Sequence, residues 1–191
     1  MKHLEEGMIL YHGSYCPVEN PDLSKCAQFK DFGGGFYLTS SKEQAKSFSK
    51  ISSSRAKESG VISANERFGF ISFYRLKNIS ELKTFYFDFA DSDWLHCVVA
   101  HRKTNAFPEL KEKMQPFDVI SGKIANDDTN TTIVAYMSNL YGQMGSAKAD
   151  DFCISLLLPE RLKDQFCFRT KFAVDKLEFL KTEKVSLESH R

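Results

Sequence analysis

Long apolar runs are missing from this sequence, and no stretch approaches the roughly 20 residues that a membrane-spanning helix needs. The first residues, MKHLEEGMILYHG, also lack the apolar core of about 7–15 residues that a secretory signal peptide contains. We therefore expect no membrane partner and a cytoplasmic location. Export by a route that needs no signal peptide is the alternative.

Paired cysteines and an excess of charge of one sign are missing too. The five cysteines are scattered without a Cys-x-x-Cys pair, which argues against both a disulfide framework and a zinc knuckle. Lysine plus arginine number 26 and aspartate plus glutamate number 25. The resulting net charge of +1 gives no reason to expect a nucleic acid or an anionic membrane as a partner.

Aromatic residues, in contrast, are abundant. The chain of 191 residues contains 17 Phe and 7 Tyr, and 42% of it is hydrophobic, which is enough for the core of one ordinary domain. We expect this single domain to span residues 1–185. A frayed C-terminal tail is expected at residues 186–191.

Strand and helix signals follow one another without a regular βαβ rhythm, which favours an α+β fold over a doubly wound sheet. Residues 15–34 have few apolar positions and predict a long loop, and loops of this length are often functional. A capping box at residues 40–43 predicts a helix that fades near residues 52–54. We expect the strands at 70–76 and 83–89 to pair. Further strands are expected at 8–11, 36–39, 117–124, 165–170 and 179–185, and further helices at 91–103, 131–141 and 150–158.

Two motifs carry candidate chemistry. A histidine ends the first predicted strand, in Tyr11-His12-Gly13-Ser14, and the glycine after it lets a ligand approach the backbone closely. The alternative is a structural histidine, which is the more common case. The segment Asp31-Phe32-Gly33-Gly34-Gly35-Phe36-Tyr37-Leu38-Thr39 leads from three glycines into an aromatic strand. Its spacing fits neither GxGxxG nor GxxxxGKS/T, so we exclude both of those phosphate-binding loops.

A pair of aromatic residues follows from the second motif. Tyr37 ends the predicted strand, and Phe48 lies eleven residues later on the helix that comes next. Two aromatic side chains so placed can hold a flat ring between them. In a chain with 13% aromatic residues, the alternative is that both belong to the core.

The order and context of these motifs resemble a known group. The segment from Gly35 to Phe48 resembles the part of the diphtheria-toxin and poly(ADP-ribose) polymerase group that builds the nicotinamide pocket, and His12-Gly13-Ser14 is similar to an earlier motif of that group. Over about residues 8–180 the chain resembles a bacterial family of unknown function within the ADP-ribosyltransferase-like fold group. The matching segments also include Asp118-Val119-Ile120 and Gln165-Phe166-Cys167-Phe168-Arg169-Thr170.

The resemblance implies both a fold and a ligand. The implied fold is α+β and ADP-ribosyltransferase-like, with two packed, mainly antiparallel small sheets and flanking helices around an NAD-binding cleft. NAD is the implied substrate, and no metal is expected. His12 would bond a ribose hydroxyl, while Tyr37 and Phe48 would stack on the nicotinamide ring. The implied binding residues are His12, Gly13, Ser14, Gly35, Phe36, Tyr37 and Phe48.

The third motif of that group carries an acidic residue, and Gln165 stands at the matching position of this chain. The resemblance implies catalytic roles for Gln165, His12 and Tyr37. A glutamine keeps the hydrogen bonds of a glutamate but loses its charge. That charge would stabilise the positive charge that develops as the glycosidic bond breaks.

Two acids are candidates for supplying the missing charge. Asp118 starts a predicted strand, and Asp127 precedes a predicted helix. The alternatives are that Asp127 caps this helix and that Asp118 orients a backbone turn or Arg169.

The function implied by these motifs is mono-ADP-ribosyl transfer from NAD to an unknown acceptor, which is a protein, a nucleic acid or a small molecule. One alternative is an NAD glycohydrolase. Another is a catalytically silent module that binds NAD, ADP-ribose or a protein. Family analogy suggests a role as a toxin, a phage-conflict factor or a regulator. For a toxin we expect a small antitoxin-like protein that covers the cleft.

Overall fold

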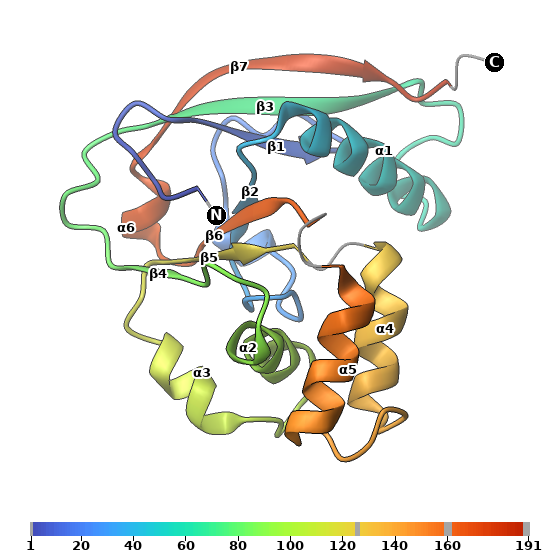
Figure 1. Ribbon diagram of the computed structural model, residues 1–191. Coiled ribbons are helices and arrows are strands. Elements are labelled where there is room, and N and C mark those ends of the chain that lie inside the picture. Colours follow the sequence, from blue (N-terminus) through green and yellow to red (C-terminus); the bar gives the residue numbers. More distant parts are fainter. Residues whose placement is uncertain (1, 125–126, 159–161, 189–191) are drawn as a thin grey trace.

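The computed structural model contains two small sheets that pack against each other, with helices around them (Figure 1). It describes residues 2–124, 127–158 and 162–188, and at residues 127–128 only the backbone. Sheet A contains β1 (Ile9–Ser14), β3 (Phe68–Leu76) and β7 (Leu177–Ser186), with β3 in the middle. Sheet B has the order β2-β6-β5-β4, and its strands are β2 (Phe36–Leu38), β6 (Asp164–Phe168), β5 (Val119–Lys123) and β4 (Thr84–Tyr86).

Strand direction confirms the α+β class with two mainly antiparallel sheets. All strand pairs of sheet A are antiparallel, and in sheet B only β4 and β5 are parallel among the described strands. β7 ends at Ser186, where the sequence predicted the tail to begin. Residues 189–191 of that tail lie outside the described part of the chain.

The helices lie on separate layers of the molecule. The helices between residues 92 and 157 lie together on the side of sheet B that faces away from sheet A (Figure 1), whereas α1 (Lys42–Glu58) lies against sheet A. A short 3-10 helix, η1, interrupts the long loop between β1 and β2. The helices are η1 (Leu23–Lys25), α1 (Lys42–Glu58), α2 (Ser92–Arg102), α3 (Pro108–Met114), α4 (Asp127–Met137), α5 (Ala147–Leu157) and α6 (Lys171–Val174).

The side chains of β6 point alternately to its two faces, and they pack sheet B against sheet A on one side and against the helices on the other. Phe166 and Phe168 are fully buried in the cluster between the two sheets, where they meet Leu10 and Tyr74 of sheet A. Cys167 lies on the other face of β6 and belongs to the cluster between sheet B and the helices. This alternation is the normal geometry of a strand, in which successive residues point to opposite faces.

α1 begins one residue later than predicted. Ser41 caps it rather than Ser40, and the Ser41 hydroxyl accepts a hydrogen bond from the Gln44 N–H at 3.3 Å. The helix also continues through the serine-rich stretch where the sequence predicted it to fade. Within that stretch Ser54 Oγ donates a hydrogen bond to Glu58 Oε1 one turn further on, at 3.0 Å. α1 therefore runs through all three serines and ends at Glu58.

The predicted pairing of the strands at 70–76 and 83–89 is wrong. β3 pairs with β1 and β7, whereas β4 pairs with β5 in sheet B. Because β3 is central in sheet A, its neighbours already use the backbone groups on both of its edges.

Three helices in the second half differ from the prediction. α4 spans Asp127–Met137 instead of residues 131–141. α5 begins near Ala147 instead of residue 150, because Ser146 caps it by accepting a hydrogen bond from the Ala149 N–H at 3.4 Å. α3 was not predicted. Its N-cap residue, Phe107, is left-handed with φ of 44° and offers no side-chain cap, so the usual sequence signal is absent.

The close approach of α1 to β1 yields a prediction. A Cβ at Gly13 would lie 1.9 Å from the Ala45 carbonyl oxygen and 2.8 Å from the Ser49 nitrogen, both of them backbone atoms. We expect Gly13→Ala to lower the free energy of unfolding by about 1–3 kcal/mol, the usual effect of overpacking. Urea denaturation measures this. Gly34→Ala is the control, because its Cβ would meet only the end of the exposed Gln28 side chain. Equal effects of the two substitutions would contradict the prediction.

Candidate functional site

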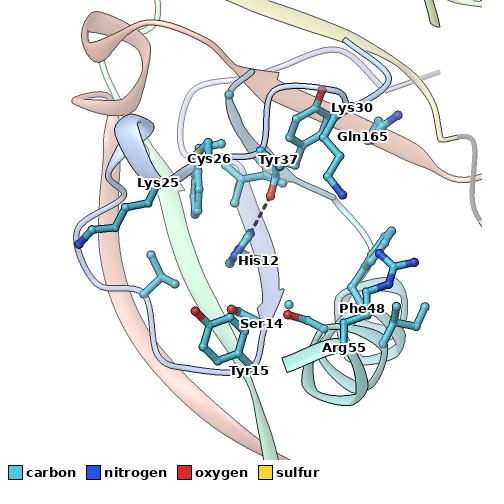
Figure 2. A pocket seen from close by; sticks show the side chains of 18 of the residues that line it. His12, Ser14, Tyr15, Lys25, Cys26, Lys30, Tyr37, Phe48, Arg55 and Gln165 are labelled. Atoms are coloured by element: carbon cyan, nitrogen blue, oxygen red, sulfur yellow. Dashed lines mark hydrogen bonds between the residues drawn. The ribbon is translucent and has the colours of Figure 1, made fainter. Parts of the chain in front are cut away.

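A cavity of about 1130 Å³ opens beside the adjoining edges of the two sheets. Its volume is slightly above the range of about 300–1,000 Å³ that is usual for small-molecule and cofactor sites. Figure 2 shows walls from β1, β2, α1, β6 and the loop between β1 and β2. Every binding residue implied by the sequence lines this cavity, as does Gln165. The structure therefore brings together residues that are far apart in the chain.

The two sheets are joined at one wall of the cavity. Tyr11 of β1 and Thr39 after β2 exchange two backbone hydrogen bonds, of 2.9 and 3.0 Å. The next residue of β1 is His12, and its Nδ1 lies 2.8 Å from the carbonyl oxygen of Tyr37. Because a carbonyl can only accept, Nδ1 carries the proton and Nε2 is left as an acceptor.

Burial keeps the His12 ring neutral. It lowers the pKa of His12 below the ordinary value, and the hydrogen bond to the Tyr37 carbonyl offsets part of this shift. The ring packs on Phe36 with 4.4 Å between ring centroids. His12 thus presents a neutral imidazole with an acceptor nitrogen, which suits a hydroxyl group of a ligand.

The hydroxyl of Tyr37 holds the glycine-rich loop in place. It accepts a hydrogen bond from the Phe32 N–H at 2.9 Å and donates one to the Gly33 carbonyl at 2.8 Å. Burial raises the pKa of Tyr37 well above its ordinary value, so the phenol stays protonated and able to donate. Gly33 is left-handed, with φ of +82°, and a Cβ there would lie 2.7 Å from the His101 ring. The hydroxyl therefore fixes the loop while the ring forms part of the cavity wall.

Phe48 comes from a stripe of α1 that faces the cavity. Phe48, Ile51, Ser52 and Arg55 line it at intervals of three and four residues, which is the repeat of one helix face. Tyr37 and Phe48 make no ring contact with each other within the described part of the chain. They lie on different walls in Figure 2, which leaves space between them for a ligand.

The other implied binding residues mainly shape the backbone and the core. Gly13 lets α1 pack on β1, and a Cβ at Gly35 would lie 2.5 Å from Cys167 Sγ. Ser14 is buried at the end of β1, and Phe36 is buried between the sheets while its ring supports His12.

Gln165 belongs to a buried polar network that the sequence did not reveal. Its Nε2 donates to Asp31 Oδ2 at 2.6 Å and to the Lys123 carbonyl at 3.3 Å. Asp31 in turn accepts a hydrogen bond from Arg102 Nε at 3.0 Å. Asp31 and Arg102 both line the cavity. The only sequence signal for Asp31 was its place at the start of the glycine-rich segment.

Of the two candidate supporting acids, Asp118 lies outside the cavity. Asp118 Oδ1 accepts from Thr170 Oγ1 at 2.8 Å, and Oδ2 accepts from the Lys83 N–H at 3.1 Å. The Asp118 carbonyl also bonds the Arg169 N–H at 2.8 Å, and Asp118 does not line the cavity. This geometry matches the alternative in which Asp118 orients a backbone turn. The side chain of Asp127 lies outside the described part of the chain.

Neither a cluster of metal-binding side chains nor a membrane-spanning helix is found among the described residues. Among these residues no group of three or more His, Cys, Asp or Glu side chains could hold a metal ion. No helix within the same residues combines the length and the apolar character needed to cross a membrane.

Comparison with known families assigns the chain to a family. Residues 8–179 match the family described as "Protein of unknown function (DUF3990)", and the chain belongs to this family. A search of curated proteins finds no match.

The role of the Tyr37 hydroxyl can be tested without removing the ring. Tyr37→Phe leaves the buried Phe32 N–H without its partner, so we expect the free energy of unfolding to fall by about 1–3 kcal/mol. Hydrogen exchange at the Phe32 amide should accelerate. Tyr141→Phe is the control, because no described residue bonds the Tyr141 hydroxyl. Unchanged exchange at Phe32 would show that the hydroxyl does not hold the loop.

The neutral state of His12 predicts a pH dependence. Its folded pKa lies below the ordinary value of 6.5, so the contribution to stability is present above pH 6.5 and is lost as the pH falls through the folded pKa. His12→Asn keeps a donor for the Tyr37 carbonyl but does not titrate. We expect the free energy of unfolding of this variant to fall less steeply between pH 7 and pH 5. His101, whose pKa burial also lowers, still titrates in both proteins. Identical slopes would contradict the assignment.

Proposed function

We propose that this domain has an ADP-ribosyltransferase-like fold, binds NAD⁺ in the cavity and transfers ADP-ribose to a single acceptor group. The observation that carries the proposal is that one cavity is lined by His12, Tyr37, Phe48 and Gln165, in the order and spacing of the motifs that resemble the NAD-binding group. Its size is adequate for a ligand as large as NAD⁺.

Each wall offers a partner for a different part of NAD⁺. Tyr37 and Phe48, on different walls, would hold the flat nicotinamide ring between them. The His12 Nε2 acceptor would bind a ribose hydroxyl. Lys30 and Arg55 also line the cavity, and their positive charge complements the diphosphate.

The reaction would begin at the bond between the nicotinamide nitrogen and the ribose carbon. Nicotinamide leaves with the electron pair of that bond and becomes neutral, while positive charge develops on the ribose. A lone pair of the acceptor then forms the new bond to the same carbon, and the acceptor loses its proton to solvent. Positioning of the two reactants contributes much of the rate in such a step.

The first test of this proposal is nicotinamide release from NAD⁺ by the purified protein, with and without cell lysate. Transfer predicts release that increases with lysate and leaves labelled ADP-ribose on a macromolecule or small molecule. Release of free ADP-ribose without lysate would instead assign the protein as an NAD glycohydrolase. Binding of NAD⁺ with no release in either condition would contradict an enzyme and indicate a silent binding module.

Binding itself can be tested by substitution. We expect His12→Ala and Phe48→Ala each to weaken NAD⁺ binding by roughly 10-fold to 100-fold, because each removes one hydrogen bond or one stacking face. Isothermal titration calorimetry measures the affinity. Phe152→Ala is the control, since Phe152 is an exposed aromatic residue of α5 outside this cavity. Unchanged affinity in both cavity variants would contradict the proposal that NAD⁺ binds in this cavity.

A further inference from the structure

We propose that Asp31 takes over part of the role of the missing acid at position 165, by orienting and polarising the amide of Gln165. This inference rests on the proposed function. It makes Asp31 a positioning residue, because the proposed role is exerted through the hydrogen bond from Gln165 Nε2 to Asp31 Oδ2. The direction in which the Gln165 amide points decides whether this role is possible.

The partners of Gln165 determine that direction. Nε2 lies 2.6 Å from Asp31 Oδ2 and 3.3 Å from the Lys123 carbonyl oxygen. A carboxylate and a carbonyl both accept, so the amino group must face them and the amide cannot be turned around. No described residue donates a hydrogen bond to Oε1 of Gln165. This oxygen is therefore available to accept a hydrogen bond from a ligand hydroxyl in the cavity that Gln165 lines.

The carboxylate of Asp31 is itself held from two directions. Arg102 of α2 donates to Oδ1 from Nε at 3.0 Å, while Gln165 of β6 bonds Oδ2. Arg102 is anchored in turn by Asn130 Oδ1, 2.9 Å from its Nη1. The chain next to Asp31 is fixed as well, because the Phe32 N–H bonds the Tyr37 hydroxyl. With only 6% of Asp31 and 4% of Gln165 exposed, water screens this contact little.

The negative charge of Asp31 would then affect the ligand by polarising the amide of Gln165. A carboxylate that accepts a hydrogen bond from an amide N–H makes the oxygen of the same amide a stronger acceptor, because hydrogen bonds in a chain polarise one another. A ribose hydroxyl bound to Oε1 would gain most as positive charge develops on the ribose. Arg102 balances the charge of Asp31, so the arrangement orients and polarises Gln165 instead of presenting a bare carboxylate.

The test exchanges the two side chains. Asp31→Asn should lower the kcat of nicotinamide release at least 10-fold, with less than a threefold change in KM for NAD⁺. In the double variant Asp31→Asn with Gln165→Glu, the introduced asparagine amide can donate to the new carboxylate, and kcat should recover to at least the wild-type value. Asp151→Asn, an exposed acid on α5, is the matched control.

The single substitution Gln165→Glu gives an independent readout if Asp31→Asn does not fold. It places two carboxylates at hydrogen-bonding distance, and one of them must take up a proton. Its kcat should therefore be low at pH 8 and rise as the pH falls, unlike that of the wild type.

Three results would overturn the inference. They are an unchanged kcat in Asp31→Asn, a loss that the double variant does not recover, and a wild-type pH profile in Gln165→Glu. In each case, nicotinamide release by the wild-type protein would still support the proposed transferase function. A wild type that binds NAD⁺ but releases no nicotinamide would overturn both proposals together.

Discussion

The junction between β1 and β2 is the constraint on which the site depends. Two backbone hydrogen bonds between Tyr11 and Thr39 tie the edge of one sheet to the edge of the other. They set His12 against the Tyr37 carbonyl, and this contact determines which ring nitrogen stays free to accept. Because the same strand β2 leads into α1, the junction also places Phe48 on the cavity wall. A shift of one residue at this point would turn these side chains to the opposite face.

Tyr37 connects that junction to the buried polar network. Its backbone fixes His12, its ring lines the cavity, and its hydroxyl holds the backbone at Phe32, next to Asp31. Asp31 then bonds Gln165, which lies 134 residues further along the chain. A motif that looked incomplete in the sequence is thus joined to an acid from another segment. The cavity therefore has a carboxylate next to Gln165, although residue 165 itself carries no charge.

Local patterns predicted much of this structure, and long-range contacts account for the rest. Strand signals predicted β6, and motif spacing indicated that Tyr37 and Phe48 would share one binding site. The pairing of β3 could not be predicted, because strand propensity does not indicate which other strand will pair with it. The contact between Asp31 and Gln165 left no sequence signal for the same reason. Asp118 looked like a supporting acid, but its carboxylate bonds a threonine and a backbone N–H outside the cavity.

The most direct test of the central claim is a crystal structure with an NAD⁺ analogue whose nicotinamide bond cannot break. We predict that the nicotinamide ring lies between Tyr37 and Phe48, and that ribose hydroxyls contact His12 Nε2 and Gln165 Oε1. A cavity that stays empty at saturating analogue, or a nicotinamide ring bound elsewhere on the protein, would contradict the NAD⁺ site.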